Sequence, residues 1–414
     1  MKPRARRVMH IPRPAGYVFC ACMLLACSLA ACQGAEQIDD EILTDGDGFA
    51  GDTGGESDGD GGFEQDGADD FPDGDQPDGG SGDDAADAGH DGGTDGGSGD
   101  ETADAGPDGA DELVVVRDPA LAGDLSWTES EAEVGIDNVD IPLSIYLPDG
   151  SGPFPVVVFH HGFQLAPDLY TSYGEHLASW GYVVVFPAMP GGLFDSPNHR
   201  ELKEYLLAIL DWLDDNAADQ QGPLGGKADM SILGLAGHSM GGKIALLAAS
   251  EDDRPLGVFG VDPVDAAGGP MNTVGPDYPS VTPELMDQIT VPLGLLGETV
   301  NATCEGFMCQ ACAPEEDNFQ QYYLHAVSPV LEIEVIGANH MSFLDNPDCG
   351  MTCSACPKGT DDPETTRMLT RRYLTAFFQV VLRSENAYFH YLTGPGMEAD
   401  EDAGLVVSQS KNGF

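Results

Sequence analysis

Residues 231–243 read S-I-L-G-L-A-G-H-S-M-G-G-K, and this stretch decides the fold. The apolar run over 232–236 predicts a buried strand, and the run over 244–249 predicts a helix. Between them, residues 237–241 have the pattern G-x-S-x-G, with Ser239 at the turn. A strained serine between a strand and a helix is typical of a nucleophile elbow, in which the glycines allow close packing. We therefore predict that Ser239 is a catalytic nucleophile.

Short apolar runs alternate with helical patterns on both sides of this stretch. We expect strands at 125–133, 141–147, 155–160, 182–187, 230–236, 256–261, 291–296 and 331–336, and helices at 170–180, 201–219, 242–250 and 364–382. This alternation favours an α/β fold with a mostly parallel, doubly wound sheet. Active sites of such sheets lie at the carboxyl ends of the strands, where Ser239 is expected.

The first residues have the pattern of an export signal. Basic residues precede an apolar stretch over 17–31, which is short for a membrane span. The stretch ends in L-A-A-C and resembles the lipobox of bacterial lipoproteins. We predict a signal peptide over 1–31 and a lipid anchor on Cys32, with Cys27 as a weaker alternative and an ordinary cleaved signal as another. The predicted location is the bacterial cell envelope, facing the periplasm or the exterior.

Residues 33–112 are rich in Asp and Gly and contain no Lys or Arg, in a chain with a formal net charge of -54. Such a segment cannot bury enough apolar surface to fold, so we expect a disordered acidic linker. Its D-G-D units are too irregular for calcium loops. The acidity argues against a nucleic-acid partner. We expect one catalytic domain over 113–394, a C-terminal tail over 395–414, and a monomer.

A serine nucleophile needs a histidine base, and in this kind of fold the order along the chain is serine, acid, histidine. The chain has ten histidines, but only His325, His340 and His390 follow Ser239. His340 lies in G-A-N-H-M, directly after the last expected strand. We predict that His340 is the base. His161 precedes the elbow and is expected to support its loop.

Three carboxylates are candidates for the acid that orients the base. Asp262 ends the strand that follows the elbow helix, and Glu298 ends the next strand, which is the more usual position. Asp265 is a third possibility. The residues by themselves leave this choice open, since a carboxylate at a strand end can simply cap a turn.

An oxyanion hole requires two backbone N–H groups directed at the developing charge. We predict that the N–H of Met240 and the N–H of Phe163 supply them, the latter from the segment H-H-G-F after an expected strand. Apolar side chains near these positions suggest an apolar ester substrate; they are Phe163, Leu165, Met189, Phe194 and Met240.

Six cysteines follow the elbow: Cys304, Cys309, Cys312, Cys349, Cys353 and Cys356. Their two C-x-x-C pairs are compatible with a zinc site. An exported chain with an even number of cysteines favours three disulfides instead, with a pairing that the sequence does not reveal. Bridges between the two clusters would brace the loop that carries His340. We expect no metal and no cofactor.

Five motifs resemble the chlorophyllase branch of the α/β-hydrolase superfamily, in a match that covers most of 155–345: H-H-G-F, G-H-S-M-G-G-K, G-V-D-P-V-D, C-A-P-E-E-D-N-F and G-A-N-H-M-S-F-L-D. That branch is related to bacterial polyester hydrolases and cutinases. The resemblance implies an α/β-hydrolase fold and assigns the first Asp of D-P-V-D, Asp262, as the acid. Met240 departs from the family, which usually has Arg there.

We therefore predict a serine carboxylic-ester hydrolase that uses Ser239, His340 and Asp262 and forms an acyl-enzyme. Peptidase or thioesterase activity is the alternative within enzymes, because the same three groups serve those reactions. A surface-displayed binding protein that has lost activity is the alternative outside them.

Overall fold

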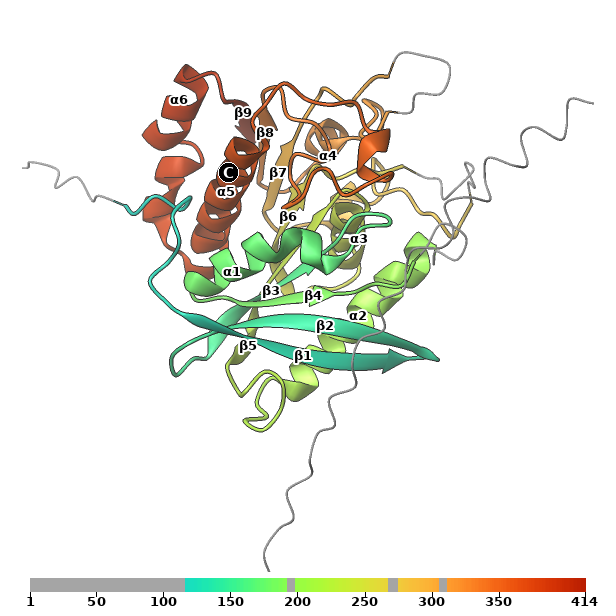
Figure 1. The fold of residues 1–414 in the computed structure, drawn as a ribbon, viewed down its shortest axis with the longest axis vertical. Coiled ribbons are helices and arrows are strands. Elements are labelled where there is room, and N and C mark those ends of the chain that lie inside the picture. The colour runs from blue at the N-terminus through green and yellow to red at the C-terminus, as the bar shows by residue number, and fades with distance from the viewer. Residues whose placement is uncertain (1–115, 192–197, 267–274, 305–310) are drawn as a thin grey trace, which may run out of the picture. The chain divides into compact units, whose positions relative to one another are not determined.

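The structure is a computed structural model that describes residues 116–191, 198–266, 275–304 and 311–414 (Figure 1). The predicted signal peptide, Cys32 and the linker over 33–112 lie outside the described residues, as do Phe194 and Cys309.

The described residues form a nine-stranded sheet with the order β1-β2-β4-β3-β5-β6-β7-β8-β9. The strands are β1 (Trp127–Ile136), β2 (Val139–Pro148), β3 (Phe154–His160), β4 (Val183–Pro187), β5 (Ala228–His238), β6 (Pro255–Val261), β7 (Leu293–Gly297), β8 (Val330–Val335) and β9 (Val406–Lys411). Strands β3 to β8 are mutually parallel. The hairpin of β1 and β2 is antiparallel to β4, and β9 is antiparallel to β8. This confirms the predicted α/β fold with a mostly parallel sheet.

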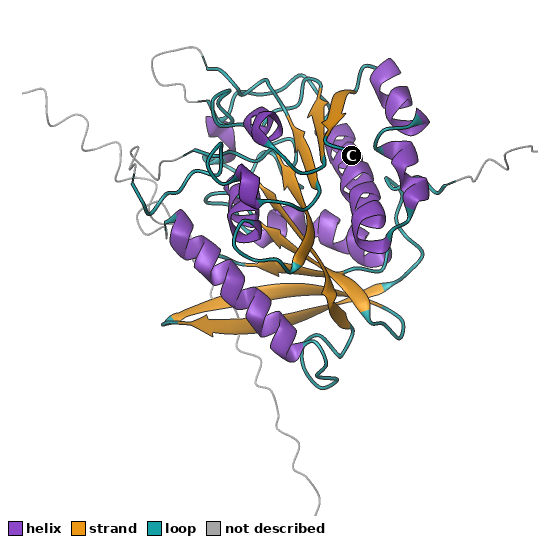
Figure 2. Cartoon of the chain, turned by 180° about the vertical axis from the view of Figure 1, so that it is seen from behind, coloured by secondary structure: helices purple, strands orange, loops and turns teal. Residues whose placement is uncertain are grey.

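Helices cover both faces of the sheet. The helices are α1 (Thr171–Ser179), α2 (His199–Asn216), α3 (Met240–Ala249), α4 (Phe319–His325), α5 (Pro363–Arg383) and α6 (Pro395–Asp402), with 3-10 turns at η1 (Pro167–Tyr170), η2 (Met286–Gln288), η3 (Cys353–Ala355) and η4 (Asn386–Tyr391). Helices α1 and α5 pack on the face seen in Figure 1. Helices α2, α3 and α4 pack on the opposite face, which Figure 2 shows with α2 in front.

This double cover explains the apolar runs in the sequence. All five residues of β4 are buried, and so are six of the seven residues of β3. A strand that is buried on both faces cannot alternate apolar and polar residues, so it forms a continuous run of Val, Ile, Leu and Phe. The helices that cover the sheet present apolar stripes of their own, such as Leu202, Leu206, Ile209 and Leu213 on α2.

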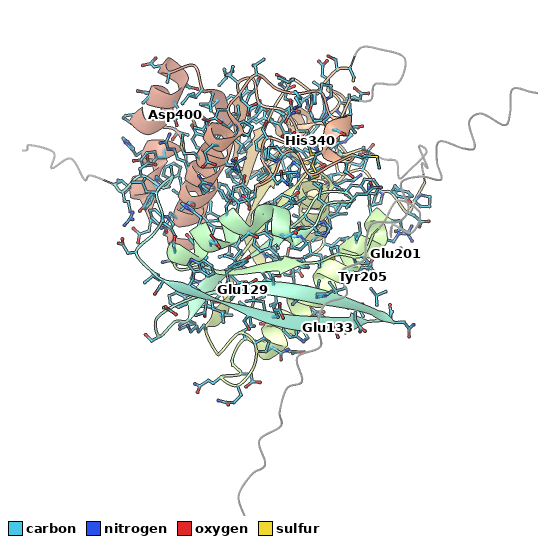
Figure 3. The ribbon with its side chains drawn as sticks, viewed as in Figure 1. Glu129, Glu133, Glu201, Tyr205, His340 and Asp400 are labelled. Carbon is cyan, nitrogen blue, oxygen red and sulfur yellow. A yellow bond between two sulfur atoms is a disulfide. The ribbon has the colours of Figure 1, made fainter. Side chains whose placement is uncertain are left out.

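Strand β1 lies at one edge of the sheet and carries charge on its exposed positions. Glu129, Glu131 and Glu133 alternate along it and are exposed (Figure 3). A charged edge disfavours pairing with a strand from another chain.

The predicted boundary at residue 394 is too early, because residues 395–411 contain α6 and β9 and belong to the same fold. Asp400 on α6 accepts hydrogen bonds from Arg372 on α5, at 2.7 and 2.6 Å, and from the hydroxyl of Tyr373 at 2.7 Å (Figure 3). Phe414 stacks on Phe377 with ring centroids 5.9 Å apart. The polar sequence V-V-S-Q-S-K of β9 gives a weak strand signal, since an edge strand that is largely exposed needs few apolar residues.

Candidate active site

Ser239 lies at a sharp turn between β5 and α3, as the G-x-S-x-G pattern predicts. Its φ angle of 56° is in the left-handed region, which is strained for a residue with a side chain. A Cβ atom on Gly237 would lie 2.4 Å from the backbone of Gly241, and one on Gly241 would lie 2.1 Å from the carbonyl oxygen of His160. Both positions therefore require glycine. The tight packing holds Ser239, which is partly exposed, at the carboxyl end of the sheet.

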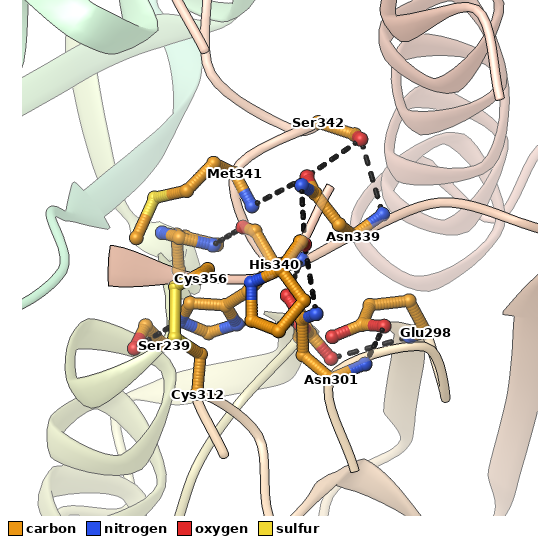
Figure 4. A network of polar contacts seen from close by, with 12 residues as sticks. Ser239, Glu298, Asn301, Cys312, Asn339, His340, Met341, Ser342 and Cys356 are labelled. Atoms are coloured by element: carbon orange, nitrogen blue, oxygen red, sulfur yellow. Dashed lines mark hydrogen bonds and ion pairs between the residues drawn. A yellow bond between two sulfur atoms is a disulfide. The ribbon is translucent and has the colours of Figure 1, made fainter. Parts of the chain in front are cut away.

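His340 lies between Ser239 and Asp262 in a continuous set of hydrogen bonds. Figure 4 shows His340 beside Ser239. Its Nε2 is 2.8 Å from Oγ of Ser239, and its Nδ1 is 2.6 Å from Oδ2 of Asp262. These three residues are far apart in the sequence, and the sheet brings them together because β5, β6 and β8 are parallel and end at the same edge. The arrangement is the one in which a histidine can take a proton from a serine while a carboxylate orients its ring.

Asp262 is completely buried directly after β6, and its φ angle of 44° is also in the left-handed region. Its backbone N–H donates to the carbonyl oxygen of Leu296, and its Oδ1 accepts the N–H of Glu298 at 3.2 Å. The neighbouring strand β7 therefore holds both the backbone and the side chain of Asp262. Such strain at two site residues is sustained by the surrounding hydrogen bonds.

Glu298, the alternative acid, is buried but makes no hydrogen bond to His340 among the described residues. Its Oε2 accepts the N–H of Asn301 at 2.8 Å. The third candidate, Asp265, pairs with Lys243, whose Nζ is 3.2 Å from its Oδ1. Both members of that ion pair are fully buried.

Asp265 also accepts hydrogen bonds from Ser280, Val281 and Thr282 at 2.6–3.0 Å. It therefore fastens the segment around residue 281 to α3, through Lys243. The contacts of Asp265 are structural. Of the three carboxylates, only Asp262 is hydrogen-bonded to the imidazole of His340 among the described residues.

Burial sets the protonation of His340. It lowers the pKa of His340 to about 4, so the imidazole is neutral near neutral pH and can accept a proton. Burial also lowers the pKa of the adjacent His238 well below its ordinary value. A neutral base beside a serine hydroxyl is the state that nucleophilic attack requires.

The two N–H groups predicted for the oxyanion hole lie on segments that meet at Ser239. Met240 begins α3, so its N–H points out of the first turn of the helix. A Cβ atom on Gly162 would lie 3.3 Å from Cβ of Ser239, which places Phe163 on the adjoining loop. Within the described ranges, neither N–H donates to another residue. Both are therefore available to an oxygen of a bound substrate.

The remaining histidines have other environments. His161 accepts the N–H of Met189 at its Nε2, 3.0 Å away, and its Nδ1 lies 2.9 Å from the carbonyl oxygen of Gly162. It thereby connects the loop after β3 to the loop after β4, in the supporting role that the sequence suggests. His325 lies on α4, and His390 is exposed near the C-terminus.

The chlorophyllase family model matches residues 121–396, which include every element from β1 to the start of α6. The chain belongs to the chlorophyllase family. It is 25% identical to chlorophyllase-1 of Arabidopsis thaliana over 292 residues, which cover 64% of this chain and 87% of the relative. It is 27% identical to a chloroplastic chlorophyllase-1 of Citrus sinensis over 244 residues, covering 58% of this chain and 71% of the relative.

Members of the chlorophyllase family are ester hydrolases. The shared segment contains Ser239, Asp262 and His340 together with both loops that meet at the elbow. The family relationship therefore agrees with the fold and with the type of chemistry that the hydrogen-bonded set can perform.

Tyr170 and His238 connect the loops of the site in this chlorophyllase-family chain, although the sequence did not predict a role for either. Tyr170 accepts the N–H of Gly162 at 3.2 Å, and its hydroxyl lies 2.8 Å from Nδ1 of His238. Nε2 of His238 lies 3.0 Å from the carbonyl oxygen of His340. These contacts form a buried relay from the loop of Phe163 to the loop of His340. The G-x-S pattern includes His238 only as its variable position, so the motif gave no signal for this role.

The prediction of disulfides is confirmed at the described cysteines, whereas the predicted number of three bridges is not tested, because Cys309 lies outside the described residues. Cys312 pairs with Cys356, and Cys349 pairs with Cys353. Cys304 is also disulfide-bonded. The first of these bridges joins the loop after β7 to the loop after His340, as expected (Figure 4).

The described residues contain one group of at least three potential metal ligands, formed by Asp262, Glu298 and His340, whose ligand atoms lie within 4.8 Å of one another. Two of the three, Asp262 and His340, are already hydrogen-bonded to each other. In the same described ranges, no helix is both long and apolar enough to cross a membrane.

Proposed function

We propose that this chain is a serine carboxylic-ester hydrolase that works through Ser239, His340 and Asp262. The observation that carries the proposal is the unbroken set of hydrogen bonds from the partly exposed hydroxyl of Ser239, through His340, to the buried Asp262. Membership in a family of ester hydrolases supports the reaction type.

In the proposed reaction, Oγ of Ser239 attacks the carbonyl carbon of the ester, and Nε2 of His340 takes the serine proton. The imidazolium that forms is stabilised by the Asp262 carboxylate at Nδ1. His340 then donates its proton to the oxygen of the leaving alcohol as the carbon–oxygen bond breaks. Water attacks the acyl-enzyme with His340 as the base, and this step releases the carboxylic acid and restores Ser239.

The negative charge on the carbonyl oxygen would be held by the N–H groups of Met240 and Phe163. Such donors act on charge that develops in the transition state and contribute several kcal/mol where water is excluded. Two observations support this proposal: Met240 follows Ser239 at the start of α3, and Gly162, the residue before Phe163, packs against the side chain of Ser239.

We propose an apolar ester as the substrate and no cofactor. Leu165 and Met189 are buried near the elbow, while Phe163 and Met240 are partly exposed. The reaction needs only the groups named above, since an ester carbonyl is activated by hydrogen bonds alone.

The proposed setting is the bacterial cell envelope, with a monomer held at a membrane through acylated Cys32. The support is the sequence L-A-A-C after an apolar stretch, followed by the acidic linker. Incorporation of a radioactive fatty acid tests this: Cys32→Ser should abolish the label, and Cys27→Ser should leave it. The reverse result would assign the anchor to Cys27.

The function is tested with a chromogenic short-chain ester and a fluorophosphonate probe. Wild-type protein should hydrolyse the ester and take up the probe, and Ser239→Ala should do neither while its thermal unfolding stays cooperative. Ser231→Ala, a change at an exposed serine of β5, serves as the control. Equal turnover by Ser239→Ala would contradict the proposal.

The same assay separates the alternatives. A peptidase or a thioesterase would label with the probe yet prefer amide or thioester substrates in a parallel panel. A binding protein that has lost activity would not label at all.

A further inference from the structure

Two buried carboxyl groups lie side by side at the proposed site. Asp262 follows β6 and Glu298 follows the neighbouring strand β7, and neither side chain has any exposure to solvent. An oxygen of each lies within 4.8 Å of the other and of a ring nitrogen of His340. Among the described residues, neither carboxyl forms an ion pair with a Lys or an Arg. Two carboxylates this close and this buried cannot both hold a charge at low cost.

The hydrogen bonds show which of the two is suited to the charge. Asp262 is contacted at both oxygens, by Nδ1 of His340 at 2.6 Å and by the N–H of Glu298 at 3.2 Å. Glu298 accepts the N–H of Asn301 at Oε2, and its Oε1 is buried with no hydrogen-bond partner in the described part of the chain. A buried carboxylate oxygen that lacks a donor costs more free energy when the group is ionised than when it is neutral, so the unpaired Oε1 favours the protonated form of Glu298.

We propose that Glu298 is a positioning residue that is held as a neutral carboxylic acid, with its proton on Oε1, so that the charge of the pair stays on Asp262 beside His340. The proposal rests on the catalytic roles of Asp262 and His340 given above. It means that the site carries one negative charge, located at the oxygen that orients the imidazole.

The surroundings of Glu298 agree with a neutral acid. Burial, together with the charge of Asp262 and of the more distant Glu334 on β8, raises the pKa of Glu298 to about 9, against the opposing effect of the N–H groups of Asn301 and Val300. Among the His, Cys, Asp and Glu side chains that the structure describes, His340 is the one that joins the pair within 4.8 Å, and it is neutral near neutral pH. Burial raises the pKa of Asp262 well above its ordinary value, so the two carboxyls compete for one proton. The hydrogen bonds at both oxygens of Asp262, from His340 and from the N–H of Glu298, favour its charged form and leave the proton with Glu298.

Infrared spectroscopy tests the location of the proton without relying on turnover. Near neutral pH, the wild type should show the carbonyl stretch of a buried protonated carboxyl, and Glu298→Gln should lack it. The matched control is Glu332→Gln, at a buried glutamate on β8 whose pKa burial raises to only about 6. Glu332 also has a buried oxygen without a hydrogen-bond partner, but at pH 8 it is ionised while Glu298 keeps its proton, so its replacement should leave the band measured at that pH unchanged. A band that persists in Glu298→Gln, or no band in the wild type, would overturn the proposal.

Stability as a function of pH gives a second test. Because the pKa of Glu298 rises from an ordinary 4.5 to about 9 on folding, its contribution to stability is complete below the lower value and is lost as the pH rises to the upper one. The free energy of unfolding of the wild type should therefore fall relative to that of Glu298→Gln across this range. Parallel curves would contradict a protonated Glu298.

Activity separates this proposal from the proposed function. Gln offers an N–H where the protonated acid has an O–H, so Glu298→Gln should retain kcat within about 5-fold, while Glu298→Ala, which leaves Asn301 without its acceptor, should lose more. If Glu298 were the ionised acid of the reaction, Glu298→Gln would lose about 10⁴-fold in kcat. Failure of the ester-hydrolase proposal would appear instead as full turnover by Ser239→Ala and would leave the infrared result unaffected.

Discussion

The side-chain oxygen of Asn301 accepts the backbone N–H of His340 at 2.9 Å, across 39 residues of sequence. The amide of the same side chain donates to the carbonyl oxygen of Pro357, which also accepts a hydrogen bond from Asn339. The loop after β7 therefore holds the backbone of His340 directly and also through Pro357. Since Nε2 of His340 must stay within reach of Ser239, Asn301 controls the geometry of the proposed base.

Replacement of Asn301 should damage both stability and turnover. Asn301→Ala leaves the buried N–H of His340 without an acceptor, which costs about 1–3 kcal/mol. We expect kcat to fall by about 10- to 100-fold with a smaller change in KM, because the imidazole is displaced. Chemical denaturation and steady-state kinetics measure the two effects.

The control for this prediction is Asn318→Ala. Asn318 is equally buried and caps α4 by accepting the N–H of Gln320 at 3.1 Å. Its loss should cost about 1 kcal/mol and leave kcat unchanged. Equal loss of kcat in both variants would show that Asn301 acts only through general stability.

The pairing of Asp262 with His340 predicts a distinct pH dependence. Burial lowers the pKa of His340 to about 4 from an ordinary 6.5. An ionised Asp262 at 2.6 Å from Nδ1 acts in the opposite direction, because it favours the imidazolium. The neutral imidazole is the base, so kcat/KM should rise with pH through a midpoint between these two values. Asp262→Asn should reduce kcat by about 10⁴-fold and move the midpoint lower. A midpoint that does not move would show that Asp262 is not ionised beside His340.

The disulfide between Cys312 and Cys356 should affect the site as well as the stability. It closes a loop of 44 residues. Cys356 is followed by Pro357, whose carbonyl oxygen accepts hydrogen bonds from the side-chain amides of Asn301 and Asn339. Replacing both cysteines by serine should cost about 4 kcal/mol in the chain-entropy model and also lower kcat.

The second bridge provides the control. Cys349 and Cys353 are only four residues apart, so their replacement by serine should cost about 2 kcal/mol at most and leave kcat nearly unchanged. If both double variants lose kcat equally, the loop of His340 does not depend on the longer bridge in particular. Thermal unfolding and ester hydrolysis measure both pairs.

Local sequence patterns predicted the elbow, the eight expected strands and the position of His340, because each depends on residues that are adjacent in the chain. The acid could not be chosen this way. Asp262 and Glu298 both end a strand, and only the three-dimensional path of the loop after β8 decides which of them meets His340. Strand β9 was not predicted, because it is held by backbone hydrogen bonds to β8 and its polar sequence lacks the apolar pattern of a strand.

Residues that act through other residues were missed for the same reason. Asn301 and Tyr170 belong to no catalytic motif, and their roles arise from contacts over 39 and 68 residues of sequence. Asp265 shows the opposite case. It is part of the family motif, but among the described residues its carboxylate forms a buried ion pair with Lys243 and no hydrogen bond with His340.

The ion pair of Lys243 and Asp265 should be essential for stability and not for chemistry. Removing one member leaves an unpaired buried charge, so Lys243→Met or Asp265→Ala should cost about 3–5 kcal/mol. The exposed pair of Arg200 and Asp277 is the control, and Arg200→Met should cost about 1 kcal/mol or less. If Asp265→Ala were to abolish kcat at a temperature where it is folded, Asp265 would have to be part of the reaction. Denaturation and turnover on the same samples decide this.

The relay through Tyr170 should couple the two loops that meet at Ser239. Its hydroxyl accepts the N–H of Gly162 and donates to Nδ1 of His238, which leaves Nε2–H of His238 to donate to the carbonyl oxygen of His340. In this series of hydrogen bonds, Nδ1 of His238 accepts and Nε2–H donates. His238 must therefore be in its neutral form, because the protonated ring would have a donor at both nitrogens. Burial, which keeps the pKa of His238 low, maintains that form.

Tyr170→Phe removes the hydroxyl at almost constant volume and should lower kcat by about 10- to 100-fold, since the N–H of Phe163 next to Gly162 is no longer held in place. KM should change little. Tyr182→Phe is the matched control, because Tyr182 is equally buried and its hydroxyl bonds to Gln379, away from the site. Both variants should lose a similar amount of stability. If the two variants also had the same kcat, the hydrogen bonds of Tyr170 would stabilise the loops without positioning the oxyanion donors.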